Sequence, residues 1–130
     1  MVTEVRVEKL DVGDYGAQYT DGSYCPVFWE RKNLSDLFST LTSGYVRFKK
    51  EIKRAKEAKV KLVLAIEGNV GDILNGVPHS RTEGITILRK LMTLWLRYDL
   101  MPVFFDSRVT MAATIREFFE AFGRSYKVTK

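Results

Sequence analysis

Apolar residues recur at every second position near the start of the chain, a spacing typical of β-strands. Residues 5–15 follow this alternation, with a slip near Lys9, and predict a first strand. Residues 19–23 hold an Asp-Gly pair, which is a strong turn signal. Residues 24–32 are rich in aromatic and β-branched residues and predict the returning strand. The pattern therefore predicts an antiparallel N-terminal hairpin.

Helical spacing follows the hairpin. Residues 34–41 predict a short helix, with Asn33 or Ser35 as its N-cap. Residues 45–58 predict a second helix, because four apolar side chains recur there on one face: Tyr45, Phe48, Ile52 and Ala55. Cations occupy the flanks and the opposite side of this helix, so we expect it to bury one face only.

Strands and helices alternate in the second half of the chain. Nearly continuous apolar runs at residues 60–67 and 101–105 are typical of strands covered on both faces. Residues 80–98 predict a long helix that begins with capping-box spacing at 80–83, and residues 109–122 predict the last helix. The expected buried stripe of the long helix is Leu88, Leu91, Met92, Trp95 and Leu96. This order predicts an α/β fold with a mixed sheet.

Composition narrows the class of protein. The 130 residues have the size of one domain, and no linker or repeat divides residues 1–130. The single cysteine, Cys25, excludes an internal disulfide framework. No apolar run approaches the roughly 20 residues that span a membrane, and the N-terminus lacks the apolar region of a signal peptide. We therefore expect an intracellular protein without a membrane partner.

Positive charge is concentrated on one predicted helix. Between Tyr45 and Lys61, eight cations against two acids give a net charge of +6, whereas the rest of the chain sums to about −1. A local basic face favours a polyanionic partner, because contacts to phosphates release counterions. A solvated, lysine-rich helix surface is the alternative interpretation.

Three charged residues of the hairpin have the chemistry of a metal site. Glu30 and Lys32 are two apart in a strand and project from one face, and the turn would bring Asp14 across from Glu30. Unpaired charges are costly in a core, whereas carboxylates suit Mg²⁺, which is often shared with substrate phosphate. Such an ion stabilises phosphate charge and activates water, and a lysine can assist both. The set is the minimal equipment of a metal-dependent phosphodiesterase.

A longer string surrounds these residues: Gly13-Asp14-Tyr15, then Glu30-Arg31-Lys32, then Asp36. It resembles the signature of the XPF-family nuclease domain, Gly-Asp followed by Glu-Arg-Lys-x-x-x-Asp. The resemblance covers residues 5–122 and implies a restriction-endonuclease-like, three-layer α/β/α fold whose mixed central sheet is built on the N-terminal hairpin. It also implies a Mg²⁺- or Mn²⁺-dependent endonuclease that acts on branched, flap or junction DNA.

The resemblance assigns roles to five residues. Asp14 and Glu30 would be metal ligands, Lys32 the catalytic lysine, and Arg31 and Asp36 supporting members of the site. From strand geometry alone, we expect Arg31 on the other face, where it would orient a carboxylate. Asp36 also fits a purely structural role, because an acid in the first turn of a helix interacts favourably with the helix dipole.

Further residues complete the expected site. Glu67 ends a buried strand beside Gly68 and is a candidate for an additional contact to metal or water. The expected DNA contacts are the basic residues Arg47, Lys50, Lys53 and Arg54. The resemblance also implies a homodimer or heterodimer through the C-terminal helices.

Two family elements are not found in this sequence. Family members carry an Asp-x-Arg-Glu strand before the Gly-Asp strand, but only eleven residues precede Val12-Gly13-Asp14 here. The tandem helix-hairpin-helix module is also missing. We therefore expect reduced activity, unless the natural start lies upstream, and a separate DNA-binding subunit. The alternatives are a catalytically silent DNA-binding or scaffolding domain, and a nuclease of the same fold that acts on ordinary duplex DNA or on RNA.

Overall fold

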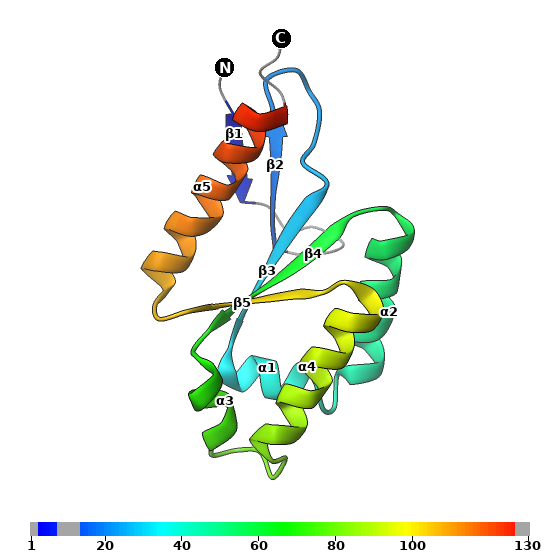
Figure 1. The fold of residues 1–130 in the computed structure, drawn as a ribbon, viewed down its shortest axis with the longest axis vertical. Coiled ribbons are helices and arrows are strands. Elements are labelled where there is room, and N and C mark those ends of the chain that lie inside the picture. The colour runs from blue at the N-terminus through cyan, green and yellow to red at the C-terminus, as the bar shows by residue number, and fades with distance from the viewer. Residues whose placement is uncertain (1–2, 8–13, 127–130) are drawn as a thin grey trace.

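The computed structural model describes residues 3–7 and 14–126, and its centre is a five-stranded mixed sheet (Figure 1). The strands lie side by side in chain order. The first three are antiparallel neighbours, and the last three are parallel neighbours. Their bounds are β1 (Thr3–Val7), β2 (Tyr15–Tyr19), β3 (Val27–Asn33), β4 (Lys61–Glu67) and β5 (Met101–Phe105).

Helices cover both faces of the sheet, as Figure 1 shows. Alternate residues of β4 enter two separate cores: Leu64 packs with the first four helices, and Ala65 packs with the last helix. The result is the predicted three-layer α/β/α arrangement. The helices are α1 (Leu34–Thr40), α2 (Tyr45–Glu57), α3 (Val70–Asn75) and α4 (Gly84–Tyr98) on one face, and α5 (Arg108–Tyr126) on the other.

The N-terminal segment differs from its prediction. Residues 5–15 were expected to form one strand, but β1 and β2 are separate antiparallel neighbours, with Thr3 opposite Tyr19 and Val7 opposite Tyr15. The two strands therefore run in opposite directions. Lys9 and the rest of residues 8–13 lie outside the described residues. The predicted turn is confirmed, with Gly22 at a positive φ of 88°.

The start of α4 also differs from its prediction. The expected capping box at residues 80–83 does not form, because Glu83 is the N-cap without a side-chain hydrogen bond. Close packing sets this end instead: a Cβ on Gly84 would lie 2.0 Å from the carbonyl oxygen of Ile73 in α3. The capping box belongs to α3, a helix that the apolar pattern did not predict, at Asn69 and Asp72.

The buried face of α4 matches the expected stripe in part: Leu91 is buried, and Leu88 and Met92 pack against the core, as expected. The buried residues are Gly84, Ile87, Leu91 and Leu94. Trp95 and Leu96, expected in the core, are instead 42% and 88% exposed. An apolar strip of α4, formed by Ile85, Trp95 and Leu96, therefore faces outward. None of the helices in the described part of the chain is long and apolar enough to span a membrane.

Candidate active site

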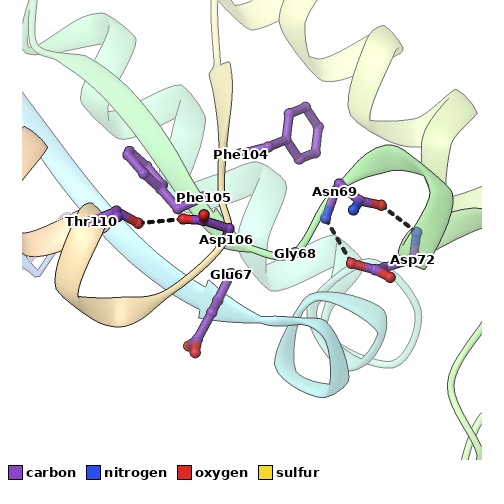
Figure 2. Close-up of a pocket in the computed structure, with 8 residues that line it drawn as sticks. All are labelled: Glu67, Gly68, Asn69, Asp72, Phe104, Phe105, Asp106 and Thr110. Atoms are coloured by element: carbon purple, nitrogen blue, oxygen red, sulfur yellow. Dashed lines mark hydrogen bonds between the residues drawn. The ribbon is translucent and has the colours of Figure 1, made fainter.

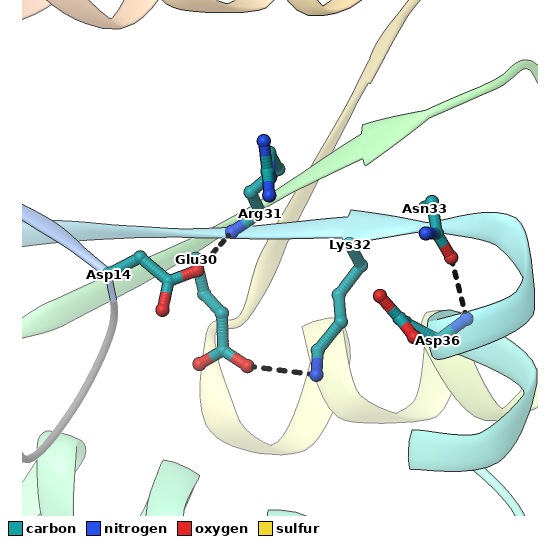
Figure 3. A network of polar contacts seen from close by, with 6 residues as sticks. All are labelled: Asp14, Glu30, Arg31, Lys32, Asn33 and Asp36. Carbon is teal, nitrogen blue, oxygen red and sulfur yellow. Dashed lines mark hydrogen bonds and ion pairs between the residues drawn. The ribbon is translucent and has the colours of Figure 1, made fainter. Parts of the chain in front are cut away.

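Strand β3 presents the acid and the lysine of the motif on one side (Figure 3). Glu30 and Lys32 point to the α2 side of the sheet, and the Lys32 Nζ lies 3.3 Å from the Glu30 Oε2. Glu30 is 8% exposed, the only buried charged residue among those that the structure describes. The strand alternation that predicted their common face is confirmed.

Asp14 reaches the same side from the start of β2. Its backbone N–H donates to the Trp29 carbonyl at 2.8 Å, and its Oδ2 accepts from the Arg31 backbone N–H at 3.0 Å. Tyr15 pairs with Trp29, so Asp14 lies across from Glu30, as expected (Figure 3). However, Asp14 precedes a strand instead of ending one. The Arg31 N–H holds the Asp14 carboxylate in place, and the contact with Trp29 fixes the Asp14 backbone beside β3.

A hollow of about 220 Å³ lies beside Glu30 and Lys32, between β3 and α2. It is lined by Glu30 and Lys32 from β3 and by Arg47, Glu51 and Arg54 from α2, with Thr40, Gly44 and Phe48. The three α2 side chains are spaced four and three residues apart, which places them on one side of the helix. The hollow therefore has two acids and three cations around it.

The acids in this hollow hold their protons unusually well. Burial, followed by repulsion from Glu51, raises the pKa of Glu30 to about 7, against the attraction of Lys32. Burial also raises the pKa of Glu51, although Lys32 and Arg54 oppose the shift. Glu51 was not predicted as part of the site, because it counted only as a minority acid in a basic helix. Its spacing from Arg47 and Arg54 was the available signal.

The donor set fits a divalent ion that is shared with a substrate. Among the described residues, no group of three or more His, Cys, Asp or Glu side chains could hold a metal ion by itself. Asp14 and Glu30 supply two carboxylates, and Mg²⁺ is commonly bound by one or two carboxylates plus water and substrate phosphates. Mutual repulsion among the acids is what a cation would relieve.

The four expected DNA contacts separate into two groups on α2. Arg47 and Arg54 line the hollow beside the acids. Lys50 and Lys53 are exposed farther around the helix, and neither lines that hollow. The basic helix thus presents two arginines at the site and two lysines to the surrounding solvent.

The other two motif residues lie away from the acids. Arg31 points to the opposite side of β3, as expected, where it lines a hollow against α5 (Figure 3). The Arg31 backbone, and not its side chain, holds the Asp14 carboxylate. The Asp36 backbone N–H donates to the Asn33 Oδ1 at 2.8 Å, which confirms Asn33 as the N-cap of α1. Asp36 thus has the first-turn position that suits a structural role.

Glu67 does not join the cluster. It lines a hollow of about 630 Å³ at the carboxyl ends of β4 and β5 (Figure 2). By strand alternation it shares the Arg31 side of the sheet, because it lies opposite Asn33. The other two acids of that hollow already have partners: Asp72 accepts from the Asn69 backbone in the capping box of α3, and Asp106 accepts from the Thr110 hydroxyl.

The α/β/α layers, with two acids and a lysine on adjoining strands, define the class as a restriction-endonuclease-like nuclease domain. Among solved structures, the chain is similar to XPF from Aeropyrum pernix, with a TM-score of 0.63 and 22% identity over 85% of this chain and 50% of that chain. The family model of the ERCC4 domain matches residues 2–118. The chain belongs to this family of nucleases.

The chain spans about half the length of the XPF chain it matches. No curated protein sequence matches it.

Proposed function

We propose that the chain is a Mg²⁺- or Mn²⁺-dependent endonuclease that cuts branched, flap or junction DNA. The observation that carries this proposal is the placement of Asp14, Glu30 and Lys32 on one side of adjoining strands, beside two arginines of α2. Members of the ERCC4 domain family are nucleases, and the family model spans most of the chain.

Each residue of the cluster has a distinct task in this proposal. Asp14 and Glu30 would hold the divalent ion, which supplies Lewis-acid stabilisation of phosphate charge. Lys32 would orient the attacking water or stabilise charge as it develops on the phosphate. Arg47 and Arg54 lie at the rim of the hollow, where they would hold flanking phosphates. Glu51 would repel the ionised form of Glu30 and so raise the pH at which Glu30 loses its proton.

Cleavage by a lysine variant tests the proposal. A labelled flap or splayed-arm DNA is incubated with Mn²⁺ and either the native chain or Lys32→Ala. We expect Lys32→Ala to lower the cleavage rate by about a hundredfold or more, because this variant has one charged donor fewer at the reacting phosphate. Lys61→Ala is the matched control, since Lys61 is also a strand lysine in an ion pair, at 3.0 Å from Asp99. Equal cleavage by both variants would overturn the proposal.

A catalytically silent DNA-binding or scaffolding domain is the second candidate. It is favoured by the finding that the described residues hold no group of three or more metal-binding side chains. Calorimetric titration with Mn²⁺ separates the two candidates. The nuclease predicts a binding site that Asp14→Asn abolishes, whereas the silent domain predicts salt-dependent DNA binding and no such site.

Partners and location follow from the same proposal. The outward apolar strip of α4 suits a second copy or a related subunit, as the resemblance implied for the C-terminal helices. A separate subunit that binds DNA would add affinity for particular DNA structures. A DNA nuclease of this family would act inside the cell, where its substrate is.

A further inference from the structure

A second basic surface lies on the α5 side of the sheet, opposite the acids. A hollow of about 380 Å³ is lined there by Arg31 of β3 and by Arg108 and Arg116 of α5, with Tyr15 of β2 at its wall. A second hollow, of about 460 Å³, shares Arg31 and Arg108. We call the first of these the arginine groove.

The arginines of this groove are not explained by the fold. Within the described ranges, neither Arg31 nor Arg108 forms an ion pair, and Arg116 pairs only with Glu120 on its own helix, at 3.2 Å. Arg108 lies in the first turn of α5, where the helix dipole disfavours a cation. Among the described residues, no ion pair joins these three guanidinium groups to an acid of another element, although Asp36 and Glu67 line the second hollow with Arg31 and Arg108.

The lining of the groove fits one strand of nucleic acid. Guanidinium groups recognise phosphates through paired hydrogen bonds. Proteins that bind single strands combine such cations with an aromatic side chain on which a base stacks, and the half-buried ring of Tyr15 lies beside the arginines. The apolar floor is provided by Met111 and Ile115. The volume of about 380 Å³ is in the range of small-ligand pockets, which can accommodate a nucleotide of a single strand.

We propose that the arginine groove binds the phosphate backbone of a single DNA strand. This inference rests on the proposed function, because the strand would be an unpaired arm of the same branched substrate. Glu30 and Lys32 face one side of β3, and Arg31 faces the other, so one strand segment contacts the DNA on both sides of the sheet. The second hollow also contains Asp36 and Glu67, and its mixed charge confines the binding to the arginine groove.

Binding measured without metal tests the inference apart from cleavage. The probe is a fluorescent thymidine oligonucleotide of about 20 nucleotides, followed by fluorescence anisotropy in EDTA at several salt concentrations. We expect Arg108→Glu to weaken binding about fivefold or more and to reduce the salt slope by about 0.7 for each phosphate that the variant no longer binds. Tyr15→Leu, which keeps apolar bulk but removes the stacking face, is expected to weaken binding about fivefold.

The control is Arg124→Glu, the same charge change at an exposed position of α5 that does not line the groove. Arg108→Glu is expected to fold at least as well as the native chain, since an acid suits the first turn of a helix. Thermal melting checks this. The inference would be overturned if Arg108→Glu and Arg124→Glu lost affinity equally, or if neither lost any. It would also be overturned if the native chain did not bind the probe, or if Arg108→Glu weakened the binding of duplex DNA more than that of the single strand.

The two proposals fail separately. If Lys32→Ala abolishes cleavage while Arg108→Glu binds the oligonucleotide normally, the nuclease stands and the arginine groove does not bind a strand. If Arg108→Glu weakens binding while Lys32→Ala leaves cleavage unchanged, the arginine groove stands and the assigned catalytic lysine does not.

Discussion

Glu30 combines a buried position with a neighbouring cation and two neighbouring acids. Burial and the repulsion from Glu51 and Asp14 together outweigh the attraction of Lys32, so the pKa of Glu30 rises to about 7. A carboxyl group in this state is partly protonated at neutral pH, and a further cation nearby would favour its ionised form. Metal binding and proton release at Glu30 are therefore coupled in the proposed site.

This coupling predicts how stability depends on pH. In the metal-free protein, the raised pKa means that folding stabilises the protonated acid; this contribution is complete below the ordinary carboxyl pKa and is lost as pH rises through about 7. Glu30→Gln removes the dependence. We expect the difference in free energy of unfolding to move by about 2 kcal/mol in favour of Glu30→Gln between about pH 5 and about pH 8.

Urea denaturation in EDTA measures this difference. Glu117→Gln, at an exposed position of α5, is the matched control. A difference between Glu30→Gln and the native chain that stays constant across the pH range would contradict the expectation, because Glu30 would then titrate alike in the folded and unfolded chains.

At the level of elements, local pattern predicted most of the fold. The helices α1 and α2 and the strands β4 and β5 lie within one or two residues of their expected bounds, because the helices have a periodic apolar face and the strands are nearly continuous apolar runs. Pattern failed where tertiary contact decides. The helix α3 has only 6 residues, fewer than two turns, which is too short for a recognisable apolar repeat. The helix α4 begins where Gly84 packs on α3 and not at a capping signal.

The residues of the site divide in the same way. The positions of Asp14, Glu30 and Lys32 followed from strand alternation and one turn. Glu51 and the arginine groove were not predicted, since each depends on how a helix is rotated over the sheet, and sequence spacing does not fix that rotation.

The contact between α3 and α4 can be tested by one methyl group. In Gly84→Ala the new Cβ would lie 2.0 Å from the Ile73 carbonyl oxygen and 2.6 Å from the Leu74 Cα, both backbone atoms. The helices must move apart, and we expect a decrease of about 3 kcal/mol in the free energy of unfolding.

Gly44→Ala is the control, because the nearest atoms to its Cβ lie at 3.4 Å, an ordinary contact distance. Denaturant titration of both variants gives the comparison. Equal stability of the two would show that α3 and α4 do not pack as closely as the structure has them.

Over the whole molecule, the surface is divided between charge and apolar area. The overall charge of +5 is concentrated around α2, whereas α4 turns Ile85, Trp95 and Leu96 outward. Exposed apolar residues that line up on one helix mark a contact surface more often than a solvent face. DNA binding and association with a further subunit would therefore use different helices, α2 for DNA and α4 for the subunit.

Self-association through α4 is expected to respond to a single charge. Leu96→Asp, at a position 88% exposed in the isolated chain, should cost little stability but weaken association about tenfold. Sedimentation velocity over a range of concentrations measures this. Val46→Asp is the control, since Val46 is a 65% exposed apolar residue on α2. A native chain that stays monomeric throughout would disprove association between copies.

Neighbouring side chains of β3 point to opposite sides of the sheet, and this limits which mutations of the strand the domain can tolerate. Positions of even number on this strand carry the proposed chemistry, and position 31 carries the proposed grip on the substrate. Substitutions at positions 30 and 32 can therefore alter the reaction while leaving substrate binding through position 31 intact. A substitution at position 31 can weaken binding while leaving the reacting groups in place. An insertion of one residue inside the strand would exchange the two roles at once, whereas an insertion of two would preserve them.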